Sequence, residues 1–108
     1  MDVSIILIKK GYRQDESNQF VESGEEKTEI FAEIKSITRT EFSAAGVYGM
    51  KPEVLFKTPV INYDGQTEIE YNNERYDVYR TYIPPDEDDY IELYTNKKVG
   101  KLEKNRNR

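Results

Sequence analysis

The sequence predicts an all-β protein: a small β-barrel of about six short strands, with one short helix inserted between the second and third strands. Three observations favour this fold class. Nine tyrosines and four phenylalanines, together with β-branched residues, supply much of the apolar material, and these residue types favour strands. Short segments alternate apolar and polar residues. Clusters of Gly, Pro, Asn and Asp separate these segments as turns do.

The first two strands are expected at residues 3–9 and 28–37, since apolar residues alternate along both. The segment between them, residues 10–27, is polar and contains Gly11 and Gly24. We therefore expect a long mobile connection that becomes ordered only against a neighbouring subunit.

A short helix is expected to begin after the second strand. Thr38 and Glu41 have the spacing of a capping box, in which each side chain satisfies a free backbone amide at the helix start. The helix is expected to end at Gly46 or Gly49, because glycine readily adopts the left-handed conformation that terminates helices. A helix of this length is marginal in water, so it must dock on the rest of the protein.

Four further strands are expected after the helix. Their expected bounds are residues 52–61, 68–71, 75–83 and 90–95. Asp64-Gly65 predicts a turn, and Asn72-Asn73 predicts a tight hairpin because asparagine tolerates a positive φ. Pro59 places the end of the third strand at an edge or a bulge. The predicted core consists of Ile30, Ile34, Val54, Phe56, Ile69, Val78, Ile91 and Leu93.

The chain divides by charge into a body and a tail. We assign residues 1–95 to a single β-barrel domain and residues 96–108 to a basic tail that is expected to be disordered. The tail has six basic residues and one acidic residue, so the net charge of −5 leaves −10 on residues 1–95. The tail residues Lys97, Lys98, Lys101, Lys104, Arg106 and Arg108 are candidates for contact with DNA or with an acidic partner.

Histidine and cysteine are both absent. Their absence removes disulfides, thiolate chemistry, the commonest transition-metal ligand and the usual activation of nucleophiles. We expect no enzyme, no catalytic or metal-binding residue and no cofactor. An acid/base hydrolase that uses Asp and Glu is the enzymatic alternative. No segment approaches the roughly 20 apolar residues that span a bilayer, so no membrane contact is expected.

Two further patterns have alternative interpretations. The acidic run of residues 86–89 can attract calcium, but it lacks the order of an EF-hand loop, and such turns are usually solvated. Seven tyrosines of the second half can form a stacking platform for single-stranded nucleic acid. They are Tyr63, Tyr71, Tyr76, Tyr79, Tyr82, Tyr90 and Tyr94. Packing in the core and at subunit interfaces is the preferred interpretation, because an acidic body repels phosphate.

Several short motifs follow one another along the chain in a characteristic order. The first group of motifs begins with Ser-Ile-Thr-Arg-Thr-Glu-Phe at residues 36–42, which is followed by Ala45-Gly46, Gly49 and Pro52. The second group lies in the second half of the chain. It consists of Tyr-Asp-Gly at 63–65, Ile-Glu-Tyr at 69–71, Tyr-Asp-Val-Tyr-Arg-Thr-Tyr at 76–82 and Ile-Glu-Leu-Tyr at 91–94. Over roughly residues 3–95 the chain resembles the head-closure, or head-to-tail joining, proteins of siphophages and prophages of low-GC Gram-positive bacteria. The turn Asn72-Asn73 departs from the glycine that relatives often use, and the basic tail has no fixed counterpart.

The resemblance implies a homo-oligomeric ring beneath the portal and its adaptor, at the virion head-to-tail junction, made of subunits synthesised in the bacterial cytoplasm. Such a ring retains packaged DNA without sequence-specific binding and offers a surface to the tail or tail-completion protein. It also implies that residues 38–51 project from the barrel toward the channel or adjacent subunits. The candidate interface residues are Thr38, Arg39, Glu41, Phe42, Val47, Tyr48 and Met50. The alternatives are a tail-side joining protein and a small single-stranded nucleic-acid-binding barrel.

Overall fold

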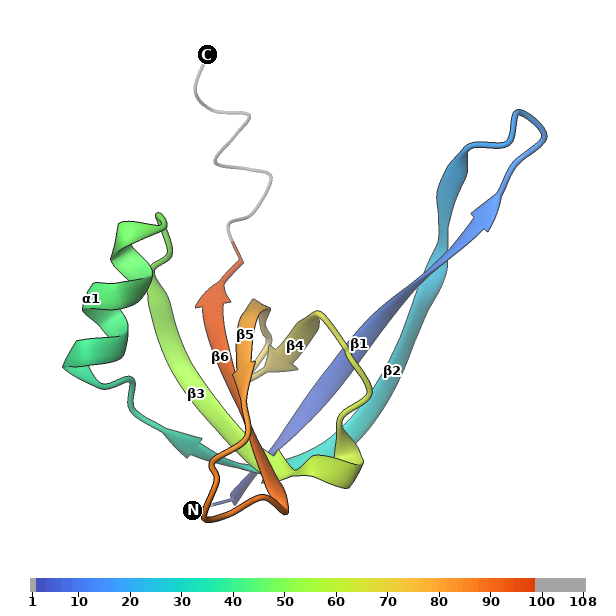
Figure 1. Cartoon of the computed structure of the whole chain (residues 1–108). Helices are drawn as coiled ribbons and strands as arrows, with labels where there is room; N and C mark the ends of the chain where they lie inside the picture. The colour runs from blue at the N-terminus through green and yellow to red at the C-terminus, as the bar shows by residue number, and fades with distance from the viewer. Residues whose placement is uncertain (1, 99–108) are drawn as a thin grey trace.

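The computed structural model describes residues 2–98, which form a closed barrel of six antiparallel strands with one α-helix between the second and third strands (Figure 1). The strands are β1 (Asp2–Gln14), β2 (Phe20–Lys35), β3 (Pro52–Pro59), β4 (Glu68–Tyr71), β5 (Glu74–Tyr82) and β6 (Tyr90–Lys97); the helices are α1 (Arg39–Val47) and the short 3-10 helix η1 (Val60–Asn62). The order around the barrel is β1-β2-β3-β6-β5-β4. The predicted fold class is confirmed.

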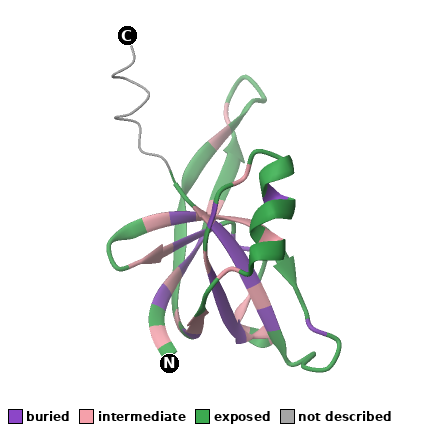
Figure 2. Ribbon diagram, turned by 90° about the vertical axis from the view of Figure 1, so that its left-hand side faces the viewer, coloured by how far each residue is buried: buried purple, intermediate pink, exposed green. Residues whose placement is uncertain are grey.

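A single core fills the barrel, and the predicted core residues either belong to it or pack against it. Phe56, Ile69 and Leu93 are fully buried, and Ile91 is buried beside them. The other four predicted residues are partly buried and pack against this cluster; they are Ile30, Ile34, Val54 and Val78. Figure 2 shows buried residues concentrated on the strands of the barrel, while α1 is almost entirely exposed.

Phe56 lies at the centre of an aromatic contact that strengthens the core. Its ring meets those of Tyr71 and Tyr76 edge to face, with centroids 5.5 and 6.2 Å apart. Edge-to-face pairs contribute beyond the area that they bury, because the positive edge of one ring meets the negative face of the other. Tyr76 is buried, so the core contains a tyrosine that the list of predicted core residues lacks.

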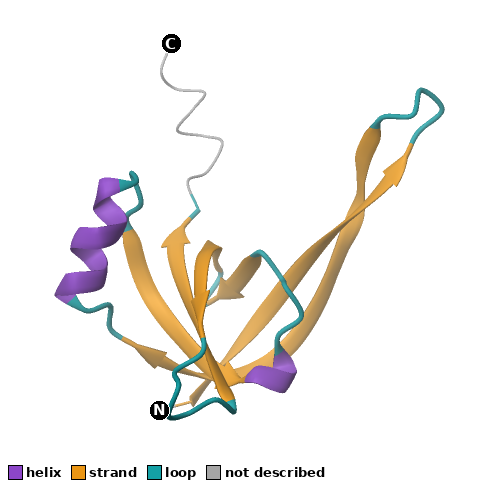
Figure 3. Ribbon diagram, in the orientation of Figure 1, coloured by secondary structure: helices purple, strands orange, loops and turns teal. Residues whose placement is uncertain are grey.

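The prediction of a mobile connection at residues 10–27 is wrong, because most of this segment is strand. β1 continues to Gln14, β2 begins at Phe20, and the two strands pair along that whole length. Residues 9–27, called the arm below, therefore form a two-stranded ribbon that extends away from the barrel (Figures 1 and 3). Asp15 organises the tip, since its Oδ1 accepts hydrogen bonds from the backbone amides of Ser17 and Gln19.

The arm contains a bulge where two glycines face each other. Gly11 pairs with Gly24, and the register then shifts so that Tyr12 pairs with Glu22. Gly24 has a φ of +132°, and a Cβ on Gly11 would lie 2.9 Å from the Ser23 Oγ. The backbone therefore favours glycine at position 24, whereas a side chain at position 11 would require Ser23 to change its rotamer. Bulges of this kind increase the local twist of a ribbon. In the sequence these glycines had indicated a loop, whereas they lie in a paired ribbon.

The helix prediction is confirmed. Thr38 is the N-cap, and its Oγ1 accepts a hydrogen bond from the Glu41 backbone amide at 3.1 Å. The helix ends before Gly49, which has a φ of +79°, whereas Gly46 lies within the helix. No helix among residues 2–98 is long and apolar enough to cross a membrane.

Turns and strand ends follow the sequence closely. Asn72 and Asn73 have φ angles of 56° and 65°, as a two-residue hairpin requires. β3 stops at Pro59 instead of residue 61, because η1 begins at Val60. β6 reaches Lys97, two residues beyond the expected end of the domain, so residues 96 and 97 of the predicted disordered tail (96–108) are part of a strand. Residues 99–108 of that tail lie outside the described residues.

Candidate subunit-docking site

Glu41 fastens α1 to the barrel wall. Its Oε1 accepts a hydrogen bond from Arg80 Nη2 at 2.6 Å, and its Oε2 accepts one from the Tyr79 hydroxyl at 2.8 Å. Both partners belong to β5. The Arg80 guanidinium also lies over the ring of Tyr94, with its carbon 4.1 Å from the centroid. Charge-assisted bonds of this geometry fix position as well as contributing energy, so the helix is held in one orientation.

The same contacts explain the ionisation of these groups. The hydrogen bond from Arg80 lowers the pKa of the Glu41 carboxyl, more than burial raises it. Burial raises the pKa of the Tyr79 hydroxyl, with its bond to Glu41 as a further cause. Glu41 is therefore charged and Tyr79 protonated at neutral pH. The second half of the expected capping box is not formed by Glu41, because its carboxylate turns toward β5 instead of the helix start.

A small, largely apolar pocket of about 280 Å³ lies between α1 and β5. Its lining residues are Glu41, Ala44, Ala45, Tyr48, Met50, Tyr79 and Arg80. Met50 is partly buried there, and its Sδ accepts a hydrogen bond from the Asn96 side-chain amide at 3.3 Å. The pocket continues the apolar surface of the helix toward the barrel.

Five of the seven candidate interface residues are exposed: the N-cap Thr38 and four residues on α1 or at its C-terminal end. These four are Arg39, Phe42, Val47 and Tyr48. The exposed fractions of the three apolar side chains are 52% for Phe42, 79% for Val47 and 81% for Tyr48. Three large apolar side chains are therefore in contact with water on one short helix and its C-cap. The other candidates, Thr38, Glu41 and Met50, hold the segment in place.

Glu68 forms a second charged cluster, at the base of the arm. Its side chain is only 5% exposed, and three cations reach it: Arg75 Nη1 at 2.7 Å, Lys98 Nζ at 2.9 Å and Lys10 Nζ at 3.0 Å. Burial alone would raise the pKa of this carboxyl, but the hydrogen bonds from Lys98, Arg75 and Lys10 outweigh it and lower the pKa to about 2. A buried carboxylate surrounded by cations has a structural role here.

This cluster also sets the direction of the arm. Arg75 lies 3.4 Å from Glu25 of the arm, and Lys10 lies 3.6 Å from Glu22. Side chains of the arm and of the barrel therefore meet around one carboxylate. Glu68 could not be identified from the sequence, since a lone glutamate in an alternating strand gives no sign that cations from three segments converge on it.

The described basic tail residues face carboxylates of their own chain. Lys97 pairs with Glu74 at 2.9 Å, and Lys98 pairs with Glu68 and with Asp77 at 3.6 Å. Their charges are thus already balanced within the barrel. The other candidates for DNA contact, Lys101, Lys104, Arg106 and Arg108, lie outside the described residues.

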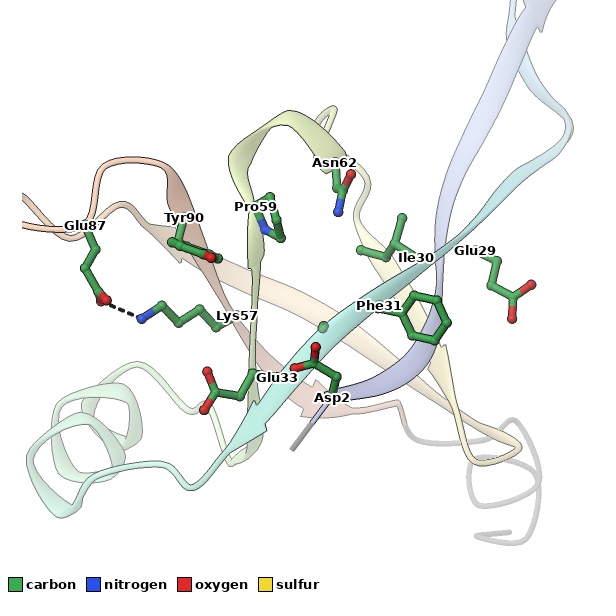
Figure 4. Close-up of a pocket in the computed structure, with 11 residues that line it drawn as sticks. Asp2, Glu29, Ile30, Phe31, Glu33, Lys57, Pro59, Asn62, Glu87 and Tyr90 are labelled. Atoms are coloured by element: carbon green, nitrogen blue, oxygen red, sulfur yellow. Dashed lines mark hydrogen bonds and ion pairs between the residues drawn. The ribbon is translucent and has the colours of Figure 1, made fainter.

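A polar pocket of about 560 Å³ lies on the barrel wall formed by β2 and β3 (Figure 4). Lys57 points from β3 toward Glu87 of the β5–β6 turn, and the two form an ion pair. The hydrogen bond with Glu87 raises the pKa of Lys57, and its ammonium lies 5.2 Å from the centroid of the Tyr90 ring. Lys57 is the one cation among the lining residues, and it is already paired, so the pocket offers no free charge to an anionic ligand.

The seven tyrosines proposed as a stacking platform do not share one surface. Tyr76 and Tyr94 are buried, Tyr63, Tyr71 and Tyr79 are partly buried, and Tyr82 and Tyr90 are exposed. Within the part of the chain that the structure describes, no three carboxylates are grouped so as to hold a metal ion, and this includes the acidic run 86–89.

Comparison with protein-family models and with curated proteins found no match to this chain.

Proposed function

We propose that this protein is a structural subunit of the head-to-tail connector of a tailed bacteriophage: a head-closure protein that forms a ring below the portal and its adaptor. Two points support the proposal. The motif order over residues 3–95 resembles that of head-closure proteins. The small barrel with a helix between β2 and β3 is the fold that this resemblance implies.

The observation that carries the proposal is the combination of exposure and rigidity at α1. Phe42, Val47 and Tyr48 are exposed, yet the helix that bears them is fastened to β5 by Glu41. Apolar side chains that gather on one exposed element can form a docking surface, and a surface held in its bound conformation loses less entropy on binding. The helix therefore presents a preformed contact for another protein.

The positions of these side chains fit contact with more than one neighbour. At 3.6 residues per turn, Phe42 and Val47 lie about 140° apart around the helix axis, and Phe42 and Tyr48 about 120° apart in the other direction. A single flat partner surface cannot cover all three. A helix that projects between two adjacent subunits, or into a groove of an adaptor, covers them together.

The charge of the body suits a passage for DNA. Residues 1–95 carry a net charge of −10, and binding to DNA draws mainly on neutralisation of its phosphates. An acidic ring holds passing DNA weakly and lets it slide. The role proposed for the subunit is therefore mechanical, without catalysis or a cofactor.

The test uses the phage or prophage that encodes the chain. Deletion of its gene should give heads that have packaged DNA but lose it or fail to join tails, as seen by electron microscopy and by the nuclease sensitivity of the DNA. Mass spectrometry of purified wild-type virions should detect the protein at the connector's copy number. Absence of the protein from virions, or normal virions after the deletion, would end the proposal; tails without a completed end would instead indicate a tail-side joining protein.

A further inference from the structure

The arm carries two strand edges that have no partner among the described residues. β1 pairs with β4 only at Ile6–Ile8, and β2 pairs with β3 only at Glu33–Lys35. The outer edge of β1 is therefore open over residues 9–14. The outer edge of β2 is open over residues 20–30. The open stretch ends there because the carbonyl of Phe31 accepts a hydrogen bond from the Thr58 hydroxyl of β3. Open edges of this length are templates for pairing with another strand.

The two edges have opposite charge. The open edge of β1 has Lys9, Lys10 and Arg13 and no acidic residue, a net charge of +3. Lys9 and Lys10 also pair with Asp64 and Glu68 of their own chain. The open edge of β2 has a net charge of −3, from four glutamates and one lysine: Glu22, Glu25, Glu26, Glu29 and Lys27. Glu22 and Glu25 also pair with Lys10 and Arg75 of their own chain, so the sign of each edge, and not a set of unpaired side chains, distinguishes the two. Like charges directly opposite each other across a strand pair are unfavourable, whereas opposite charges are favourable. Pairing of β1 with β1, or of β2 with β2, is therefore disfavoured, and pairing of β1 with β2 is favoured.

We propose that the arms of adjacent copies of this chain pair edge to edge, β1 of one copy against β2 of the next. The inference rests on the proposed ring and names one of its subunit contacts. In a ring all arms point the same way along the axis, so β1 of one copy runs opposite to β2 of its neighbour, and the pairing is antiparallel. Because the contact joins two different edges, it is heterologous, and a heterologous contact closes into a ring when its rotation permits.

The tip of the arm supports a second copy as the occupant. Tyr12 and Phe20 are 62% and 74% exposed. Tyr12 lies two residues from Gln14, which pairs with Phe20, so both aromatic side chains lie on one face of the ribbon. An isolated ribbon cannot cover them, whereas a row of neighbouring arms places aromatic side chains of one copy beside those of the next.

Charge reversal tests the pairing, and the contacts that it removes from the barrel, Lys9–Asp64 and Ser4–Glu29, are both exposed. One variant carries Lys9→Glu and Arg13→Glu, and a second carries Glu22→Lys and Glu29→Lys; none of these four positions faces another across the arm. We expect the wild-type chain to sediment as an oligomer, and each variant alone to associate about tenfold more weakly or worse. An equimolar mixture of the two variants should associate again, and so should one chain that carries all four changes. A charge-matched control, Asp86→Lys with Asp88→Lys in the exposed β5–β6 turn, should leave association unchanged.

Four outcomes of the association experiment would overturn the inference. A wild-type chain that stays monomeric at the highest soluble concentration, or variants with intact circular dichroism that associate as the wild type does, would show that the arms do not pair. Failure of the mixture would exclude charge complementarity. If association returned in the mixture of the two variants but not in the chain with all four changes, β1 would pair with β1 or β2 with β2, contrary to the proposal. Arm-dependent association of a protein that is absent from virions would leave this contact standing and end the head-closure proposal, so the two failures are distinguishable.

Discussion

The Glu41 carboxylate of α1 and the Arg80 guanidinium of β5 join segments that are 39 positions apart in the sequence, with Oε1 2.6 Å from Nη2. The Glu41 side chain is 13% exposed and that of Arg80 is 40% exposed. Because the helix has only one buried residue of its own, Ala45, this contact is a large part of what docks it. The helix is therefore coupled to the barrel largely through the Glu41 carboxylate, which binds both Arg80 and Tyr79.

Replacing Glu41 should loosen the helix more than it weakens the barrel. We expect Glu41→Ala to lower the free energy of unfolding by about 1 kcal/mol, below the usual range for bonds to charged groups because Arg80 is partly solvated. Limited proteolysis at Arg39 should become faster, since the helix leaves the barrel more often. Urea unfolding checks the first effect. Glu53→Ala, at an exposed carboxylate of β3, is the matched control, and equal proteolysis of both variants would contradict the role of Glu41 as an anchor.

Glu68 should make stability depend on pH in an acidic window. Its pKa is lowered to about 2 in the folded protein, below an unfolded value of about 4.3. Stability from this group is thus complete above about pH 4.3 and is lost as the pH falls toward 2. We expect Glu68→Gln to cost about 2 to 3 kcal/mol at neutral pH, and the difference between wild type and variant to shrink between about pH 4 and 2. Urea unfolding across this range checks it; a difference that stays constant would show that ionisation of Glu68 is not the cause.

Phe56 should be the most costly aromatic residue to truncate. It is fully buried and contacts two tyrosine rings, so we expect Phe56→Ala to lower the free energy of unfolding by about 3 to 5 kcal/mol. Phe31→Ala is the matched control, because its side chain is 68% exposed and should change stability little. Comparable losses for the two variants in chemical denaturation would contradict the strand register that places Phe56 inside.

The sequence predicted the parts of the fold that depend on local chemistry. Thr38 as a helix cap, Gly49 at the helix end and Asn72-Asn73 as a tight turn all follow from side chains acting on nearby backbone. The strand faces were predictable too, since alternation places Phe56 inward wherever its partner strands lie.

The arm was missed because its stability has another source. Its strands have little apolar material, and their backbone pairing and the Asp15 turn at the tip leave no periodic signal. The Glu41–Arg80 and Glu68 contacts were missed for a related reason: they join residues far apart in sequence, and only the closure of the barrel brings them together. The exposed residues of α1 were predicted, but the ion pair that makes them a rigid surface was not.

Charged substitutions at Phe42 or Tyr48 should separate docking from folding. Both side chains are exposed, at 52% and 81%, so Phe42→Asp and Tyr48→Asp should each change the free energy of unfolding by roughly 0.5 kcal/mol or less and leave the barrel folded. A docked aromatic group at the centre of an interface contributes about 2 kcal/mol or more to binding, and a carboxylate in its place would be buried without a partner. We therefore expect soluble variants that do not join portal-bearing heads, and heads that leak DNA or lack tails in electron micrographs.

Ser43→Asp, which adds the same charge at an exposed polar position of α1, should assemble as the wild type does. Normal virions from both aromatic variants would remove α1 as the docking surface, while loss of assembly by Ser43→Asp as well would show that added charge on the helix, not the loss of the apolar contact, is the cause.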